Sequence, residues 1–331
     1  MANEEVDLAI VGAGPCGLAA AIAAKKAGMS TVVFDRGPIV NGITHYPTYM
    51  TFFSTADRIS IGDVPFIVPT EKPSKRDALA YYRGVASHHA LDVRQYETVD
   101  RLEFVGEPRQ PSWLVHTTKI AGGAGAVRAR AVVVATGYFG RPNRLGIPGE
   151  ARAHVRHGYI DGHYAWNQQV VVIGGGNSAV DAALDMYRAG GDVTIVHFGP
   201  SLDSNVKPWV RPEIEARIRD GKIRAIFEAR VTEIGAGCVT VHGADGERQI
   251  PATQVYEMTG YLPETELLEQ TGVPIDPESG VPAHNPLTMA TPVPGVYLAG
   301  VIASGFRANR IFIENGRDHG DMIVADLQSF Y

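Results

Sequence analysis

The sequence DLAIVGAGPCGLAAA, residues 7–21, decides the fold of this chain. Its apolar run predicts a short buried strand, and the pattern Gly12-x-Gly14-x-x-Gly17 predicts a tight turn into a helix. Gly12 permits the turn, Gly14 lets a pyrophosphate approach the backbone, and Gly17 lets the helix pack on the strand. Unpaired N–H groups and the helix dipole attract phosphate to such a helix start. The segment therefore predicts a dinucleotide-binding turn.

A complete β-α-β unit surrounds this turn. Strand 6–11 and helix 15–28 precede a second predicted strand, 31–34, which ends at Asp35. Asp35 lies 18 residues after Gly17, the spacing at which a carboxylate binds the ribose hydroxyls of an adenosine. Because strand, helix, second strand and acid are all in place, we predict a nucleotide site rather than an unliganded glycine-rich turn.

The same pattern repeats from residue 170. A strand at 170–173 leads into Gly174-x-Gly176-x-x-Ala179, a helix at 178–189 and a strand at 193–196. Two Thr-Gly-Tyr segments, 136–138 and 259–261, flank this second copy and predict where the chain passes between domains. The sequence thus predicts an α/β protein with two Rossmann-like dinucleotide-binding domains, the second inserted into the first.

The two copies differ at the position that selects the nucleotide. His197 lies 18 residues after Ala179, where the first copy has Asp35. A carboxylate repels a ribose 2′-phosphate and a histidine does not, so the first copy suits FAD and the second suits NADPH better than NADH. Lys207 is a further candidate ligand of that phosphate. Arg211 fits a solvated surface cation better.

Composition excludes several classes of protein. The chain has 331 residues, 45% of them hydrophobic, and a formal net charge of -6, so nothing indicates a nucleic-acid-binding protein. The apolar stretch 18–27 is too short to span a membrane, and the acidic N-terminus does not resemble a secretory signal. Two distant cysteines, Cys16 and Cys238, form no disulfide framework. We expect a reducing cytoplasm and, for Cys238, a place in the core.

Two further groups of residues invite a functional interpretation. Aromatic residues gather in the loop around 45–53 and could line a flavin ring, or could simply pack beneath a long loop. The connector 138–168 carries His154, His157 and His163, but no cysteine or clustered carboxylate completes a ligand set, so we expect no metal site.

The whole chain resembles the thioredoxin-reductase-like flavin oxidoreductases. It is more closely similar to the YpdA family of bacillithiol-disulfide reductases, through 14–17 (GPCG), 46–48 (YPT), 51–54 (TFFS), 61–66 (IGDVPF), 207–209 (KPW), 299–303 (AGVIA) and 311–316 (IFIENG). The resemblance implies an FAD enzyme in which NADPH reduces the disulfide form of bacillithiol. It also implies an NADPH-binding domain inserted into the FAD-binding domain, and we expect residues 1–142 and 259–331 to form the latter and 143–258 the former.

The motifs and the resemblance together give the expected cofactor-binding residues: Gly12, Gly14, Pro15, Cys16, Gly17, Asp35, Arg36, Tyr46, Thr48, Phe53, Val99, Thr136, Gly137, Gly174, Gly176, Asn177, Ser178, Ala179, His197, Lys207, Gly300, Val301, Arg310, Ile311 and Phe312. The resemblance implies that backbone N–H groups around 310–312, at the start of a predicted final helix 309–328, point toward the flavin C2 carbonyl. It also matches Cys16 to the active cysteine proposed for the family.

Two roles stay open for Cys16. A helix N-terminus lowers the pKa of a thiol and favours a nucleophile that attacks the disulfide. The neighbouring FAD pyrophosphate would raise that pKa, and the phosphate turn lies far from the flavin ring, which favours a packing role.

Two departures from the wider superfamily affect the expected function. The chain lacks the C-x-x-C pair of thioredoxin reductases, and Val301 stands where an aspartate usually binds the ribityl chain. A ferredoxin- or flavodoxin-NADP reductase of the same fold needs no cysteine and is one alternative. A flavin monooxygenase or a redox-sensing flavoprotein is another, although the connector lacks the monooxygenase pattern F-x-G-x-x-x-H. The expected partners are a small thiol disulfide and a second copy of the chain as a homodimer.

Overall fold

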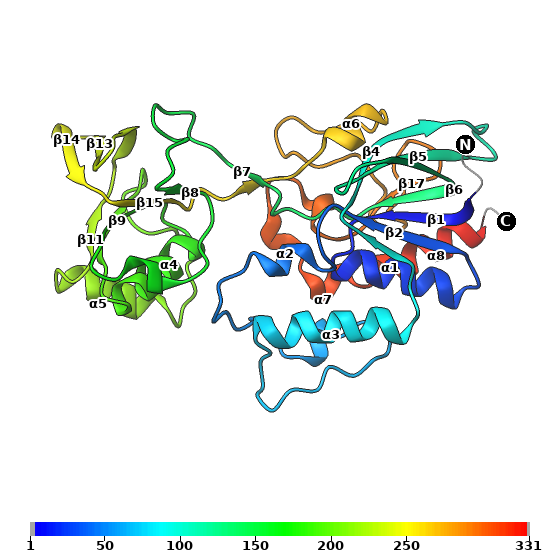
Figure 1. Cartoon of the computed structure of the whole chain (residues 1–331), viewed down its shortest axis with the longest axis horizontal. Helices are drawn as coiled ribbons and strands as arrows, with labels where there is room; N and C mark the ends of the chain where they lie inside the picture. Colours follow the sequence, from blue (N-terminus) through cyan, green and yellow to red (C-terminus); the bar gives the residue numbers. More distant parts are fainter. Residues whose placement is uncertain (1–3, 330–331) are drawn as a thin grey trace. The chain divides into compact units, whose positions relative to one another are not determined.

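The chain folds into two α/β units, which the computed structural model describes over residues 4–329 (Figure 1). Unit 1 comprises the chain up to Thr44, Met50–Arg141 and the chain from Leu262 onward. Unit 2 comprises Pro142–Tyr261 together with the short segment His45–Tyr49, whose place in this unit the sequence did not reveal. The predicted α/β class with two Rossmann-like units is confirmed.

Unit 1 contains the first β-α-β unit. Its elements are β1 (Glu5–Val11), α1 (Pro15–Lys26), β2 (Thr31–Asp35), α2 (Asn41–Thr44), η1 (Asp57–Ile59), α3 (Lys75–His88), β3 (Val93–Gln95), β4 (Glu97–Phe104), β5 (Trp113–Lys119), β6 (Ala124–Val134), α6 (Glu266–Gln270), β17 (Val296–Leu298), η3 (Gly300–Ser304), η4 (Ala308–Arg310), α7 (Ile313–Gly316) and α8 (His319–Ser329). The strand order is β3-β2-β1-β6-β5-β4, and β17 also pairs with β6.

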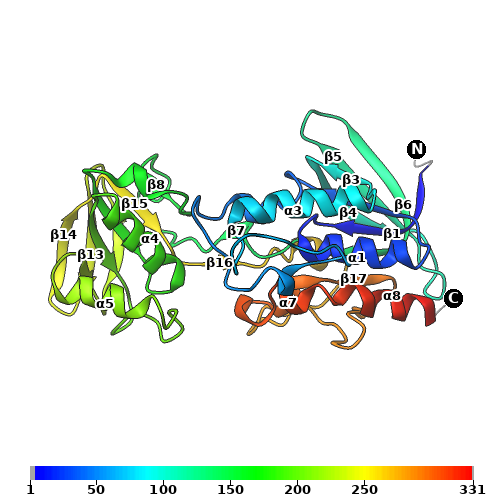
Figure 2. The ribbon, with the colours of Figure 1, turned by 90° about the horizontal axis from the view of Figure 1, so that it is seen from below.

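The sheet of unit 1 has a parallel and an antiparallel part. Strands β3, β2, β1, β6 and β17 pair in parallel, whereas β4, β5 and β6 pair in antiparallel fashion. The central parallel strands are largely apolar, as expected of strands covered on both faces. Helices α1 and α8 lie side by side (Figure 2), and a Cβ on Gly320 would lie only 2.6 Å from the Cα of Ala20. The small residues of α1 therefore permit this close helix contact.

Unit 2 contains the second β-α-β unit. Its elements, including the connecting strands β7 and β16, are β7 (Arg141–Pro142), β8 (Val155–Arg156), η2 (Gly162–Ala165), β9 (Gln169–Ile173), α4 (Asn177–Arg188), β10 (Asp192–Val196), α5 (Arg211–Arg219), β11 (Arg224–Ile226), β12 (Arg230–Ile234), β13 (Cys238–Gly243), β14 (Gly246–Pro251), β15 (Gln254–Glu257) and β16 (Tyr261–Leu262). The order β11-β10-β9-β15-β8 is parallel throughout, and β12-β13-β14 form a separate antiparallel sheet.

The chain divides at Tyr96, which has φ 57°, so β3 joins β2 while β4 joins β5. Two local predictions are wrong. The single helix predicted over 309–328 is instead divided into η4, α7 and α8, because α7 ends at Gly316 and α8 begins only at His319. Cys238 begins β13 and is only half-buried, so it is not a core residue.

No helix within residues 4–329 combines the length and the apolar character that a membrane span requires.

Candidate functional site

The first glycine turn has the geometry that its sequence predicts. Gly12 has φ 112°, and a Cβ there would lie 2.3 Å from the carbonyl oxygen of Ala135. A Cβ on Gly17 would lie 2.0 Å from the carbonyl oxygen of Gly12, so only glycine permits this contact between turn and helix. By contrast, a Cβ on Gly14 would have no neighbour within 4 Å. The backbone at Gly14, followed by Pro15 at the first position of α1, is therefore open to a ligand.

Asp35 lies against this turn. Its carboxylate oxygens accept hydrogen bonds from the N–H groups of Ala13 and Gly37, each at 2.8 Å. Burial raises the pKa of Asp35, and the two N–H donors counteract this. Each carboxylate oxygen has a further lone pair, so the group can still accept a ribose hydroxyl. The structure thus joins Asp35 to the turn by a direct hydrogen bond, and its contact with a ribose stays a prediction.

The side chain of Cys16 points into the packing beneath the turn. Methyl groups placed on Gly300 and Gly316 would lie 3.0 Å and 2.8 Å from its Sγ, so both glycines make room for the sulfur. Burial raises the pKa of the Cys16 thiol to about 12, and the nearby Asp318 contributes. In this arrangement Cys16 is a thiol at neutral pH. Cys16 as a whole is half-buried, and Gly300 and Gly316 border its Sγ.

Two backbone segments border the turn and carry polar groups suited to a cofactor. Thr136 Oγ1 is buried and has no hydrogen-bond partner within residues 4–329, so a bound group could satisfy it. Gly137 and Gly300 both have positive φ, at 81° and 77°. The Gly300 N–H donates to Nδ1 of the buried His319 at 3.2 Å, a contact that no sequence pattern indicated. Val301 follows within η3.

The expectation for residues 310–312 needs correction. Arg310 ends η4, Ile311 is extended, and α7 has only four residues. The Phe312 N–H donates to Asn315 Oδ1 at 2.8 Å, so it is already used within the chain. A helix N-terminus that presents the Phe312 N–H to a ligand is therefore absent here, because the Asn315 side chain occupies this donor.

The remaining residues expected at the first site are dispersed. Arg36 pairs with Glu264 at 2.9 Å. Phe53 is exposed in unit 1, and half-buried Val99 lies on β4 opposite Thr117. Tyr46 and Thr48 belong to the segment grouped with unit 2, where the Thr48 N–H donates to the Ile160 carbonyl oxygen at 2.7 Å. The roles of these residues toward a flavin stay predictions.

The second glycine turn reproduces the first. Gly174 has φ 140°, and a Cβ there would lie 2.4 Å from the carbonyl oxygen of Met258. Gly176 is the N-cap of α4. Asn177 joins this helix start to the following loop, because its Oδ1 accepts from the Lys207 N–H at 2.9 Å and its Nδ2 donates to the Asn205 carbonyl at 3.0 Å. Ser178 and Ala179 continue the first turn of α4.

The residues expected to bind the ribose 2′-phosphate in the second copy do not all lie as predicted. His197 is only 4% exposed, and its ring packs against Gly175, so it lies beneath the turn rather than facing a ligand. The Lys207 ammonium pairs with Asp181 on α4. The sequence missed Arg230, whose exposed guanidinium lies 4.9 Å from the centre of the Phe198 ring. The N–H groups of residues 228 and 229 donate to the carbonyl oxygens of residues 199 and 197. These hydrogen bonds place Arg230 beside the segment that follows β10, where the 2′-phosphate is expected.

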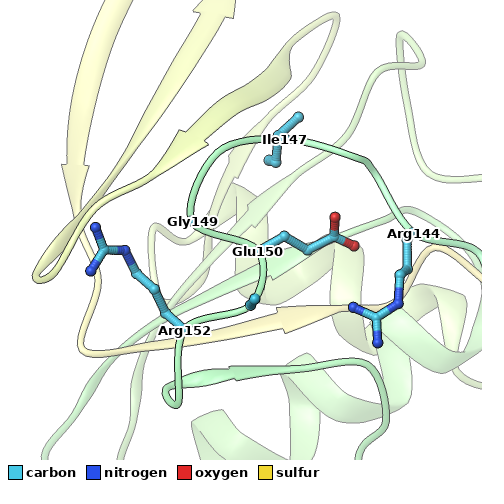
Figure 3. Close-up of a pocket in the computed structure, with 6 residues that line it drawn as sticks. Arg144, Ile147, Gly149, Glu150 and Arg152 are labelled. Carbon is cyan, nitrogen blue, oxygen red and sulfur yellow. The ribbon is translucent and has the colours of Figure 1, made fainter.

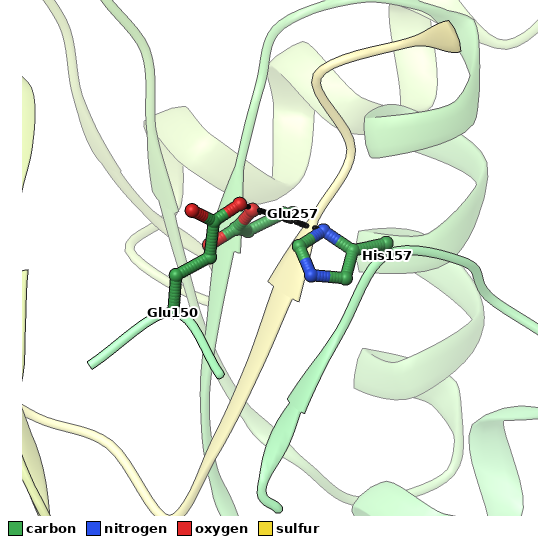
Figure 4. Close-up of side chains that lie close together, drawn as sticks. All are labelled: Glu150, His157 and Glu257. Atoms are coloured by element: carbon green, nitrogen blue, oxygen red, sulfur yellow. Dashed lines mark ion pairs between the residues drawn. The ribbon is translucent and has the colours of Figure 1, made fainter. Parts of the chain in front are cut away.

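The premise that no clustered carboxylates accompany the connector histidines is wrong. Carboxylates do accompany His157: Glu150 and Glu257 converge on it from other parts of unit 2 (Figure 4). Glu257 follows in sequence more than a hundred residues after Glu150, so no local pattern signalled this cluster.

The two turns together can hold two nucleotides. Unit 1 offers an open Gly14, a ribose acceptor at Asp35 and an unsatisfied Thr136 hydroxyl, which fit an unphosphorylated adenosine such as that of FAD. Unit 2 offers a second helix start with His197 at the sequence equivalent of Asp35, which fits NADPH, while the carboxylate of Asp203 lies 3.3 Å from His197 Nε2 and borders Gly176. Each unit thus offers one nucleotide site, as a chain that uses both FAD and NADPH requires.

Comparisons with known proteins agree with this arrangement. The family model described as "Pyridine nucleotide-disulphide oxidoreductase" matches residues 9–300. "Bacilliredoxin reductase Bdr" of Bacillus subtilis (strain 168) is 42% identical over 321 residues, which cover 96% of this chain and 96% of that protein.

Two solved structures are similar over nearly the whole chain. "Bacillithiol Disulfide Reductase Bdr (YpdA)" from Bacillus cereus has a TM-score of 0.96 at 42% identity and covers 99% of this chain and 100% of that one. Its counterpart from Staphylococcus aureus has a TM-score of 0.92 at 38% identity, with 98% and 99% covered. The predicted family resemblance is confirmed.

Proposed function

Because this chain belongs to the pyridine nucleotide-disulphide oxidoreductase family, we propose that it reduces the disulfide of a low-molecular-weight thiol, bacillithiol disulfide, at the expense of NADPH. The chain is an oxidoreductase, and FAD and NADPH, the cofactors predicted from the sequence, are those of its family. The observation that carries the proposal is the full-length similarity to two solved structures whose names specify a bacillithiol disulfide reductase.

The overall reaction balances with two electrons. One NADPH and one proton convert one disulfide into two thiols and NADP⁺. A bound flavin would supply the two-electron chemistry that links NADPH to the disulfide. For this, the chain supplies the backbone at Gly14 and the carboxylate of Asp35 to hold one nucleotide, and the Gly174–Ala179 turn to hold the other.

The part played by Cys16 in this reaction is a separate question. In one route its thiolate attacks the disulfide, one thiolate leaves and takes up a proton, and the mixed disulfide then accepts two electrons. In the other route the electrons reach the substrate without a bond to Cys16. The enclosed Sγ and the raised pKa of this thiol support the second route, or a first route that begins with exposure of the side chain.

A protein disulfide is the second candidate substrate. The Bacillus subtilis relative is named a bacilliredoxin reductase, which is a reductase of a protein, whereas the two solved structures carry the name of the small disulfide. The same electrons would then pass to a disulfide on a partner's surface. These relatives do not favour a ferredoxin- or flavodoxin-NADP reductase, a flavin monooxygenase or a redox-sensing flavoprotein.

An anaerobic reoxidation experiment tests the proposal. The FAD-loaded protein is reduced with one equivalent of NADPH and mixed with bacillithiol disulfide, a bacilliredoxin mixed disulfide or oxidised flavodoxin. Rapid return of the flavin absorbance with the small disulfide supports the proposed substrate. Reoxidation only by the bacilliredoxin supports the second candidate. Transfer to flavodoxin alone overturns both.

The same experiment with Cys16→Ala separates the two routes. Equal rates of reoxidation in wild type and variant exclude a covalent role for Cys16, and loss of reoxidation with normal NADPH reduction supports one.

We further propose that the protein works in the cytoplasm as a homodimer. Light scattering after size-exclusion chromatography measures the mass in solution and tests the dimer.

A further inference from the structure

Three side chains of unit 2 bring ligand atoms to one point inside the protein (Figure 4). Glu150 lies in the loop before β8, His157 directly follows β8, and Glu257 ends β15. One atom from each lies within 4.8 Å of the others. The distance from His157 Nδ1 is 3.0 Å to Glu257 Oε2 and 4.0 Å to Glu150 Oε1.

Glu257 is the unusual member of this cluster. Its side chain has no exposed surface, and neither carboxylate oxygen has a hydrogen-bond partner among the described residues. His157 Nδ1 is likewise buried and without a hydrogen bond, although it lies 3.0 Å from Glu257. A buried carboxylate without donors is costly, because nothing replaces its lost hydration. Glu150 and Glu257 also lie within hydrogen-bond reach of each other, so as carboxylates they are satisfied only by a shared proton or by a cation.

We propose that Glu150, His157 and Glu257 bind a divalent transition-metal ion. Two donors that each lie about 2.1 Å from one ion are about 3.0–3.4 Å apart, which agrees with the His157–Glu257 separation. One imidazole and two carboxylates suit Zn²⁺ or Mn²⁺ better than Mg²⁺, which prefers an all-oxygen set and retains water. A cation here would supply the counter-charge that the buried Glu257 carboxylate lacks.

The surroundings of the cluster fit this proposal. The Glu150 oxygens accept hydrogen bonds from the N–H groups of Leu145 and Gly146 at 3.1 and 2.8 Å. Such hydrogen bonds orient the carboxylate, as those around metal ligands do.

Glu150 also borders a cavity. Glu150 lines a cavity of about 440 Å³, together with Arg144, Ile147, Gly149, Ala151 and Arg152 (Figure 3). Arg144 lies 3.2 Å from His157 Nε2, on the side of the ring away from the cluster. Binding of an ion at Nδ1 makes Nε2 a donor, so Arg144 must give up this contact, and its exposed side chain is able to do so.

The ion would fix the end of β15 next to the second glycine turn. Glu257 directly precedes Met258, whose carbonyl oxygen packs against Gly174. A metal at Glu257 therefore stabilises the segment on which this turn rests, without contact to the nucleotide itself. We expect a rise in thermal stability of the FAD-loaded protein when the ion binds, because the ion binds only the folded cluster.

Metal binding to the EDTA-treated, FAD-loaded protein tests this proposal. Equilibrium dialysis with Zn²⁺, Mn²⁺ and Mg²⁺ is followed by elemental analysis, with Glu257→Gln and His157→Gln as variants and Glu247→Gln, an exposed position on β14, as the matched control. We expect one Zn²⁺ or Mn²⁺ per wild-type chain, unchanged binding in the control, and binding at least about tenfold weaker in both variants. Circular dichroism verifies that each variant is folded.

X-ray absorption at the zinc edge identifies the ligands. A shell of nitrogen and oxygen near about 2.0–2.1 Å with imidazole scattering supports the cluster. A sulfur shell near about 2.3 Å would assign the metal to Cys16 or Cys238 and overturn the proposal. No saturable binding by the wild type, or binding that survives Glu257→Gln unchanged, would overturn it as well.

Discussion

The reactivity of the Cys16 thiol provides a quantitative test of the first site. Burial places its pKa at about 12, compared with 9.0 for an ordinary cysteine. At pH 7.5 this difference reduces the thiolate population about a thousandfold. A more basic thiolate is a better nucleophile, which restores a factor of about 20–30, so alkylation should be about 30–50 times slower than that of an accessible cysteine, before any steric hindrance.

The assay is alkylation by iodoacetamide, followed by mass spectrometry. The Cys238→Ala variant, loaded with FAD, leaves Cys16 as the sole cysteine, and the same protein in guanidinium chloride gives the reference rate at each pH. We expect the native rate to rise with pH up to the limit of stability, without a plateau below about 9.5. A native rate within about threefold of the unfolded rate at pH 7.5, or a plateau below about pH 8, would refute the enclosed thiol and favour an activated nucleophile.

Three further predictions concern the packing and charges of the two units. In Gly316→Ala, the new methyl group lies 2.8 Å from Cys16 Sγ, so the free energy of unfolding should fall by about 1–3 kcal/mol; a smaller loss in the Cys16→Ala background verifies the contact, and an unchanged loss contradicts it. In Arg230→Ala, the KM for NADPH should rise about tenfold while that for NADH changes little, because a charge-assisted phosphate contact is lost; equal changes for both nucleotides would exclude Arg230 as the 2′-phosphate ligand. Burial lowers the pKa of His319 in the folded chain, so as the pH falls this imidazole is protonated in the unfolded chain first. The stability that neutral His319 contributes is therefore complete above about pH 6.5 and is lost as the pH falls further. His319→Asn should therefore show a shallower decrease of Tm between about pH 7.5 and 5.5, and an identical pH profile would contradict this.

The sequence predicted the two dinucleotide units because their signals are local. Gly12 and Gly17 serve contacts within a few residues or with a neighbouring strand, and both prove sterically obligatory. The Asp35 position follows from the fixed length of a β-α-β unit, and the carboxylate indeed bonds to the turn. Spacing and residue type were sufficient there, as the strand and helix periods determine which groups meet.

Several features of the candidate sites depend instead on contacts between distant segments or on side-chain pairing. The sequence could not show that Asn315 occupies the Phe312 N–H, that Lys207 pairs with Asp181, or that His197 lies under Gly175. Side-chain pairing and burial decide these cases, and neither has a period along the chain. The predicted residues are of types that suit nucleotide binding, but a hydrogen bond, an ion pair or packing within the chain already occupies several of them.

The opening segment shows where this division lies. The sequence alone determined that residues 7–21 form a strand, a phosphate-type turn and a helix, because glycine geometry and helix polarity act within the segment. Only the tertiary structure decided the state of Cys16 inside it, because Gly300 and Gly316 come from the far end of the chain to enclose its sulfur. The Glu150–His157–Glu257 cluster has the same origin, since three separate segments of unit 2 must fold together before their ligand atoms meet.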